Sequence, residues 1–252
     1  ATATSTSTTS TSVGVGGSFA MNIGVNTALA EIDGAAGLEH AGDLSLKATG
    51  EHAATVTSEA GAGGDVGVAG AVALGVGVNT TQALLPDGDA LTIAGGLTLR
   101  ADHAGSATTI ANANAAGDKV GFGVALALSG EVDQAIASLD RDLTSASGDT
   151  LIHAHALSAS ATTATASAKG AKTASDSGGA TTETTADEQV DKQKTFVDSR
   201  GKNTGATLPT TTTTTASNSS GASVSIGAAA AANIAVSTSI AEVTDTTTLT
   251  VE

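Results

Sequence analysis

The sequence holds no cysteine, tryptophan or tyrosine, and only 3 phenylalanines among its 252 residues. Without cysteine, the chain can form neither a disulfide framework nor a thiolate metal site. Compact domains of this length pack around large side chains, so the shortage of aromatic residues argues against an ordinary globular core. Sugar-active grooves rely on stacking by Trp and Tyr, which leaves a β-helix carbohydrate-active enzyme as an outlying possibility only.

Basic residues are also scarce, with 10 Lys and Arg against 25 Asp and Glu and a formal net charge of -15. Nucleic-acid binding needs clustered Lys and Arg, so we expect no nucleic-acid partner. Apolar stretches are broken by Gly, Ser and Asn, so we expect no membrane-spanning helix. An acidic, Thr-rich surface without cysteine is typical of exposed proteins, and we expect an extracellular or cell-surface location.

What the chain does have is a repeat of about 53 residues. The block VGVGGSFAMNIGVNTALAEI at 13–32 returns as VGVAGAVALGVGVNTTQALL at 66–85, and further copies begin at Val120 and Val224. Repetition at a fixed period indicates one supersecondary unit stacked on copies of itself. A solenoid has a narrow interior that Val, Ile, Leu, Ala and Thr can fill, which suits this composition.

Each copy opens on an alternation of large apolar and small residues, which is the period of a β-strand. The sequence therefore predicts an all-β fold, a parallel β-solenoid with the four repeated strands in equivalent positions along it. We expect the large apolar residues to face the core, with Val72 and Val124 shielded from solvent. In the second copy these residues are Val66, Val68, Val72, Leu74, Val76 and Val78.

The opposite face of these strands carries only small side chains and admits two interpretations. In one, it belongs to a tightly stacked sheet that tolerates small residues. In the other, it is a flat surface made for close approach of another sheet, a neighbouring fibre or a surface. We carry the second forward as a predicted assembly face, through which the chain self-associates or meets neighbouring repeats. Its residues are Gly67, Ala69, Ala71, Ala73 and Gly75.

A second landmark follows each opening strand: LSLKA at 44–48 returns as LTLRA at 97–101 and, more weakly, as TLIHA. Its alternation predicts inward leucines and an outward column of Lys47, Arg100 and His153. Like charges one coil apart, at roughly 4.8 Å, repel each other. An extended run of 53 residues also spans about 175 Å, too long for one turn of a slim solenoid. We therefore expect about two coils per repeat.

Asn26, Asn79 and Asp133 follow the opening strand in successive copies. We expect them to occupy a turn. Stacked Asn side chains can hydrogen-bond along a solenoid, so a ladder is predicted there.

Residues 157–222 break the pattern and divide the chain into repeats over 1–156, an insertion or protruding loop, and a continuing repeat over 223–252. The insertion is rich in Ala, Ser and Thr. Its charged part, 184–202, can form a short helix, and its Thr run, 208–220, an extended strand or loop. Neither end of the chain shows a polar cap, so we expect an internal segment of a longer protein with any secretion signal outside it.

Few residues suggest chemistry, and we expect no cofactor, no metal and no enzymatic activity. His153 and His155 share a strand face and can bind a metal with a third ligand, although surface residues in the outward column are the simpler reading. The Asp87-Gly88-Asp89 turn lacks the nonapeptide of calcium-binding β-rolls. Nucleotide loops and nucleophile elbows are missing from the sequence. Three further aspartates can meet across a turn, where acidic side chains usually only face water: Asp140, Asp142 and Asp149.

The block at 66–85, followed by LTLRA at 97–101, resembles the repeat regions of large bacterial exoproteins, the filamentous-haemagglutinin-like and leukotoxin-type filamentous adhesins. The resemblance covers residues 13–156 and 223–252 but not the insertion. It implies a right-handed parallel β-helix that forms an extended stalk at the cell surface, with roles in adhesion or biofilm. Such repeats carry no catalytic residues.

Two classes of function follow from these patterns. The first is a structural or adhesive segment of an extracellular fibre, with a host or cell-surface ligand as a possible partner. The second is a surface- or ice-binding solenoid, because Thr-x-Thr pairs occur in ATATSTSTTSTS at 1–12 and over Thr246–Thr250. Ice binding requires a regular Thr array on one flat face, and here the threonines cluster at turns and ends.

Overall fold

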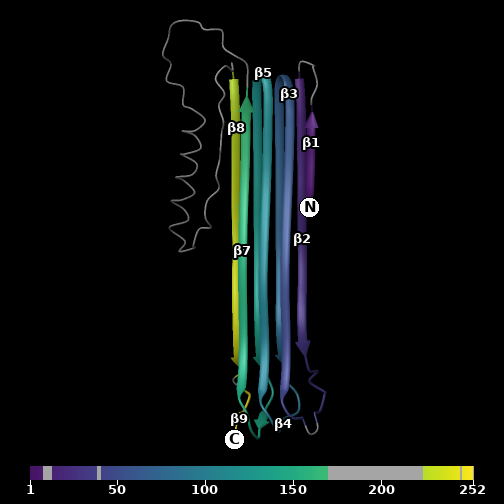
Figure 1. The fold of residues 1–252 in the computed structure, drawn as a ribbon, viewed down its shortest axis with the longest axis vertical. Coiled ribbons are helices and arrows are strands. Elements are labelled where there is room, and N and C mark those ends of the chain that lie inside the picture. Colours follow the sequence, from purple (N-terminus) through teal and green to yellow (C-terminus); the bar gives the residue numbers. More distant parts are fainter. Residues whose placement is uncertain (8–12, 39–40, 170–223, 245, 252) are drawn as a thin grey trace, which may run out of the picture.

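The computed structural model describes residues 1–7, 13–38, 41–169, 224–244 and 246–251. Within these ranges the protein is all-β, with parallel strands and no helix, an arrangement compatible with a β-solenoid (Figure 1). The strands are β1 (Thr2–Ser7), β2 (Val13–Glu31), β3 (Leu44–Leu85), β4 (Leu91–Ile93), β5 (Leu97–Leu139), β6 (Leu143–Ser145), β7 (Thr150–Lys169), β8 (Val224–Val243) and β9 (Leu249–Val251).

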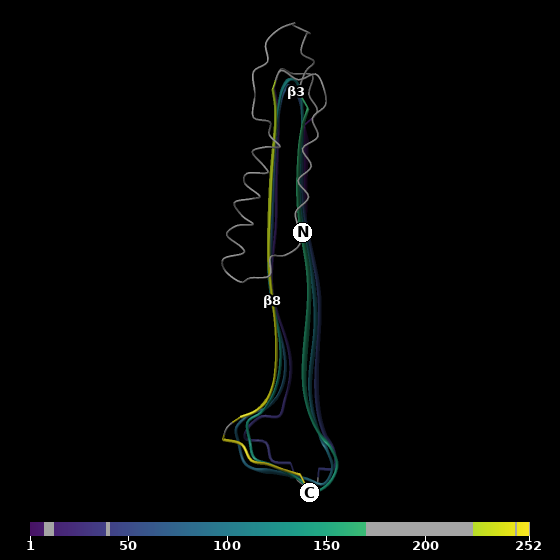
Figure 2. The same ribbon diagram turned by 90° about the vertical axis from the view of Figure 1, so that its left-hand side faces the viewer.

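The long strands β3 and β5 turn back halfway, so the chain forms two facing legs joined by a turn at one end (Figure 2). The first leg contains β1, residues 44–62 of β3, residues 97–116 of β5, and β7. The second leg contains β2, residues 66–85 of β3, residues 120–139 of β5, and β8. The reversal falls at Gly64, whose φ of 143° lies in a region that L side chains rarely adopt.

Pairing within each leg is parallel and follows the sequence repeat. Val13 pairs with Val66, Val66 with Val120, and Val120 with Val224, so the four opening strands do lie in equivalent positions. On the first leg Lys47 pairs directly with Arg100, which lies 53 positions later. One circuit of two legs and a foot separates such partners.

The expectation of two coils per repeat is therefore wrong. The circuit is flattened and long rather than slim, which accommodates the reach of the extended chain (Figure 2). Lys47, Arg100 and His153 are neighbours along the outward column, as their alternation predicted. Their mutual repulsion is offset by Asp102, which forms an ion pair with Arg100 and lies 3.8 Å from His153 Nδ1.

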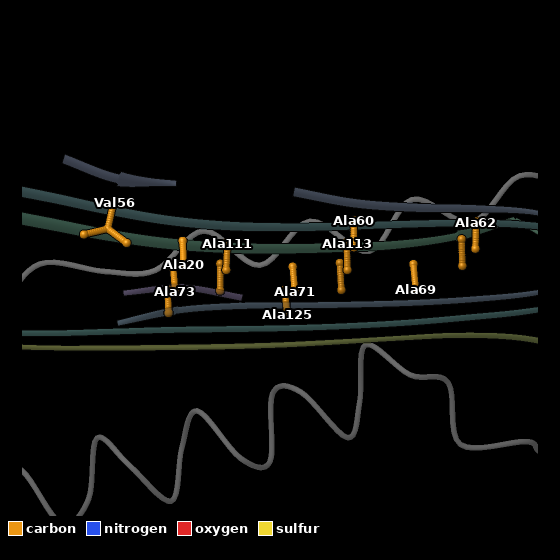
Figure 3. Packing of buried hydrophobic residues seen from close by; sticks show 14 residues of the cluster. Ala20, Val56, Ala60, Ala62, Ala69, Ala71, Ala73, Ala111, Ala113 and Ala125 are labelled. Carbon is orange, nitrogen blue, oxygen red and sulfur yellow. The ribbon is translucent and has the colours of Figure 1, made fainter. Parts of the chain in front are cut away.

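The two faces of the second leg are inverted relative to the prediction from its apolar pattern. The small side chains point into the space between the legs, where Ala73 is 0% exposed (Figure 3). The large apolar side chains point outward, and Val124 is 36% exposed and Val25 74%. Val72, which we expected in the core, lies on the same outward face and is only partly buried, between neighbouring strands.

The physical reason is the narrow spacing between the legs near the turn. A Cβ built on Gly14 would lie 1.9 Å from the carbonyl oxygen of Gly63 on the facing leg, and one on Gly67 would lie 2.7 Å from that of Ala116. Only glycine fits such positions, and alanine fits the rows beside them. Facing sheets with ordinary side chains pack at about 10 Å, so a Val-filled interior would force these legs apart.

The legs diverge away from the turn, and the interior widens into a foot (Figure 2). Leucines fill it, including Leu85, Leu97, Leu99 and Leu139. The alternation of the second landmark predicted the inward direction of Leu97 and Leu99. The foot carries a small parallel sheet in the order β4-β6-β9.

The buried Arg141 fastens the foot. Its guanidinium donates hydrogen bonds to the backbone carbonyl oxygens of Pro86 (2.7 Å), Asp33 (3.2 Å) and Ala36 (3.4 Å). These acceptors lie in two earlier passages of the chain through the foot, so one side chain ties three passages together.

The predicted insertion begins too early. Residues 157–169 continue β7 and pair with residues 104–116 of β5, so the sheet extends through them. Alanines, serines and threonines form strand here because the interior rows demand small residues. The helix predicted over 184–202 and the Thr run at 208–220 lie outside the described residues.

Candidate functional site

The predicted assembly face is not available to another molecule. Ala69, Ala71 and Ala73 belong to the largest buried cluster and pack against alanines of the facing leg, while Gly67 and Gly75 lie in the same buried rows (Figure 3). The face does serve close approach of a sheet, but the approaching sheet is the other leg of the same chain. The prediction of an assembly surface there is wrong.

The candidate chemical residues do not gather into a site. His153 and His155 lie on the outer face of β7 with ring centroids 6.4 Å apart. The Asp87-Gly88-Asp89 segment is an exposed loop between β3 and β4. Within the described ranges, no group of three or more His, Cys, Asp or Glu residues is placed to hold a metal ion.

The other three aspartates each have separate tasks near the foot. The carboxylate of Asp140 accepts a hydrogen bond from Ser138 Oγ at 2.7 Å, and that of Asp142 accepts one from the backbone N–H of Thr248 at 2.6 Å. Asp149 acts through its backbone carbonyl, which accepts from Leu97 N at 3.0 Å. They stabilise turns and strand ends.

A polar network, of which the sequence indicated only the stack of Asn26, Asn79 and Asp133, lies between the alanine and leucine parts of the interior. His103 Nε2 is 3.1 Å from Asp133 Oδ1, and His103 Nδ1 is 3.0 Å from Thr81 Oγ1. Asn79 donates to the same Asp133 oxygen at 2.8 Å. The His103 and Asp133 side chains are 0% and 1% exposed, so the pair is sealed from solvent.

The expected amide ladder is part of this network. Asn26 Nδ2 donates to Asn79 Oδ1 at 2.8 Å, and Asn79 continues the chain of hydrogen bonds to Asp133. The three residues stack across successive strands, which confirms the hydrogen bonding along the stack. They lie inside strands β2, β3 and β5 rather than in a turn, so the expected turn is wrong.

The electrostatics of the network fit a structural role. The neutral tautomer of His103 with hydrogen on Nε2 donates to Asp133 and accepts from the Thr81 hydroxyl at Nδ1. The imidazolium form donates at both nitrogens, so both ring nitrogens have a partner in either form. Glu131 lies two residues from Asp133 on the same inward face. Burial raises the pKa of Glu131, and the charge of Asp133 raises it further.

The order Thr81, His103, Asp133 matches a hydroxyl–imidazole–carboxylate relay in connectivity. Acyl transfer would require a substrate to reach the hydroxyl, and Thr81 is 0% exposed. The network instead links the two legs, since His103 lies on the first leg whereas Thr81 and Asp133 lie on the second. It specifies how the legs align in a core otherwise built from alanine.

The surfaces offered to other molecules are therefore the outer faces of the two legs. The outer face of the first leg is mainly polar, with threonines, serines and the charged column, and it also exposes Leu151 and Leu157 on β7. Exposed large apolar side chains dominate the outer face of the second leg, and we call the part between the rows of Val13 and Val25 the apolar face. Its most exposed members are Val13, Val15, Phe19, Met21, Ile23, Val25, Val224, Ile226, Ile234 and Val236.

None of the described residues forms a helix that could span a membrane. No family model, curated protein or solved structure matches this chain.

Proposed function

We propose that this chain is a non-catalytic segment of a repetitive extracellular fibre, built as a right-handed parallel β-helix and serving a structural or adhesive role. The observation that supports it is the pairing of equivalent residues in successive repeats, as in the row Val13, Val66, Val120 and Val224. Hydrogen bonds run along this row from strand to strand. Each added repeat can therefore extend the stack by about 4.8 Å without altering the earlier ones.

Side-chain contacts along the stack support the same role. One circuit is joined to the next by the ladder of Asn26, Asn79 and Asp133. An ion pair adds to it, in which Lys119 Nζ lies 2.9 Å from Asp65 Oδ2 in the adjacent turn. Serines bridge the legs within the stack, as in the 3.0 Å hydrogen bond from Ser58 Oγ to Ser18 Oγ. Contacts of this kind resist shear between circuits, which a load-bearing stalk requires.

Chains lengthened by whole repeats test this function. Inserting one or two further copies of residues 66–119 after residue 119 should lengthen the particle along the stacking direction by about 4.8 Å per copy. Electron microscopy and small-angle scattering measure this dimension. Globular growth in all directions, or loss of folding on insertion, would count against a fibre segment. Turnover in a polysaccharide-degradation screen would instead indicate the β-helix enzyme.

One observation favours a second candidate, a surface- or ice-binding solenoid. Threonines point outward from adjacent strands of the first leg, where Thr2 pairs with Thr57 and Thr55 pairs with Thr108. Glu59 on β3 interrupts this array. A thermal-hysteresis measurement decides the matter: activity that disappears in a Thr55→Lys variant would establish ice binding, and its absence in the native chain would exclude it.

A further inference from the structure

The apolar face of the second leg is wide and free of charge. Among the described residues between the rows of Val13 and Val25, no Asp, Glu, Lys or Arg points outward. The one charged residue there is Glu131, and its side chain points into the interior. Soluble monomers rarely expose a contiguous apolar patch of more than a few hundred Å². We therefore expect another molecule to cover this face.

The size of the face suits a stable protein interface. It is four strands wide, from β2 through β3 and β5 to β8. At about 4.8 Å per strand and about 3.3 Å per residue, the region from Val13 to Val25 measures roughly 19 by 40 Å. That footprint of about 760 Å² is close to the roughly 800 Å² per partner that standard interfaces bury.

The shape of the face also favours a second sheet. Its strands lie side by side with little twist (Figure 1), and flat sheets are typically stabilised by stacking on another sheet. Gly17 and Gly70 pair with each other and point outward, and a Cβ on either would meet nothing within 4 Å. These two glycines leave a hollow beside the outward rings of Phe19 and Phe122. The apolar face therefore has both protruding side chains and a hollow that such side chains can fill.

The composition of residues 170–223 does not suit a cover for this face. Residues 170–223 contain only four large apolar side chains, Val190, Phe196, Val197 and Leu208. An anionic lipid surface is disfavoured too, because such surfaces attract clustered basic residues and this chain has a net charge of -15. A second copy of the chain has an apolar face of equal size, and among the described residues that face carries no outward charged side chain.

We propose that two copies of this chain pair through their apolar faces to form a symmetric dimer. The same patch on both subunits makes the interface isologous, so bulky side chains of one copy fill the Gly17–Gly70 hollow of the other. The paired molecule buries both apolar faces and leaves the polar outer faces of the first legs on its two outsides. This inference does not depend on the proposed fibre function, since it concerns lateral pairing rather than growth along the stack.

The test is the mass of the full chain in solution, measured by analytical ultracentrifugation over a range of concentrations. The native chain should be a dimer. Val72→Lys with Leu126→Lys places two charges on neighbouring strands in the middle of the apolar face. We expect the dissociation constant of this variant's dimer to be about 100-fold or more above that of the native dimer, since a charge buried in an apolar interface is costly.

A matched control keeps the charge change and moves it to the other leg. Thr55→Lys with Thr108→Lys also places two lysines on paired outward positions, but on the polar face, and should leave the dimer intact. Gly70→Leu places a large side chain in the hollow, where its Cβ meets nothing of its own chain within 4 Å, and should weaken dimerisation by about tenfold or more. Circular dichroism checks that each variant folds, and Gly70→Leu preserves the test if the lysine pair unfolds.

Several results would overturn the proposal. A native chain that is monomeric at concentrations of about 100 µM, far above the Kd of standard interfaces, would show that no second copy covers the face. A dimer equally stable in the Val72/Leu126 and Thr55/Thr108 variants would place the interface elsewhere. Flotation of a monomeric native chain with phosphatidylcholine–phosphatidylserine vesicles, lost in the Val72/Leu126 variant, would assign the face to lipid instead.

Discussion

Replacing Ala71 by leucine, and its neighbour Val72 by leucine in a separate variant, tests which side of the second leg is the interior. Ala71 is 1% exposed and belongs to the cluster of alanines between the legs (Figure 3). Val72 points outward on the same strand. The two substitutions introduce the same side chain at adjacent positions, so only its direction differs.

The cost at Ala71 follows from the spacing of the legs. Near the turn a Cβ on Gly67 already falls 2.7 Å from a carbonyl oxygen of the first leg, and the ladder hydrogen bonds of both legs resist their separation. Overpacking a core typically costs about 1–3 kcal/mol, and three added carbons in this gap should cost about 3 kcal/mol. A chain of this size then loses about 6–12 °C in Tm. Leucine at position 72 should stay within about 0.5 kcal/mol of the native chain.

Circular dichroism is the appropriate assay, because the chain has no tryptophan or tyrosine to report by fluorescence. Thermal and urea unfolding of both variants give the two differences in free energy. Equal losses at the two positions, or a greater loss at position 72, would refute the assignment of the small-residue face to the interior.

Three further predictions concern the Asp133 network, the buried Glu131 and the segment of residues 170–223. Asp133→Ala should destabilise the fold by about 3–5 kcal/mol in urea unfolding, because it leaves His103 and Asn79 buried without their partner; a loss below 1 kcal/mol would contradict a sealed pair. Burial raises the pKa of Glu131 in the folded state, so the folded chain favours its protonated form; stability is therefore lost as pH rises through that pKa. Glu131→Gln should consequently stabilise the protein at pH 7, and the gain should vanish below the ordinary Glu pKa of about 4.3; a gain that is the same at both pH values would contradict this. Lys169 and Val224 pair with Ala116 and Val120, so replacing residues 170–223 by the Gly-Asp-Lys turn of 117–119 should leave Tm nearly unchanged, and unfolding would show that the replaced segment is integral.

The repeat in the sequence was enough to predict which strands align. Val13, Val66, Val120 and Val224 occupy one row because identical patterns bury identical rows when they stack. The inward leucines and the outward Lys47–Arg100 column were predicted by the same alternation.

Which face of the second leg is the interior could not be read from that alternation. Period-2 patterning separates two faces, and the usual rule buries the more apolar one. Here the distance between the legs decides, and that distance is set by Gly14 and Gly67 against the facing backbone. The inversion hid most of the polar network as well, because Glu131 lies on the face that we expected to be outside and Asp133 was expected in a turn. His103 was detectable, since it shares the parity of the inward Leu99 and Ala101.

The prediction of two coils per repeat was wrong in part for an electrostatic reason. Stacked Lys47 and Arg100 argued against adjacency, and the ion pair of Arg100 with Asp102, two residues along the same strand, removes much of that repulsion. The sequence argument counted only the like charges of Lys47 and Arg100, and it omitted the acidic Asp102 beside Arg100.

Disulfide cross-linking tests the central claim, that one flattened circuit joins each residue to its equivalent in the next repeat. The native chain has no cysteine, so a Thr55→Cys, Thr108→Cys variant carries a single possible bond between paired positions on the outer face of the first leg. Strand neighbours lie about 4.8 Å apart, within the Cα separation of a disulfide, and two coils per repeat would double it beyond reach. We expect rapid intramolecular cross-linking on mild oxidation and none in the matched Thr55→Cys, Asn112→Cys variant, whose positions are out of register. Absence of the bond in the paired variant, or equal cross-linking in both, would contradict the account.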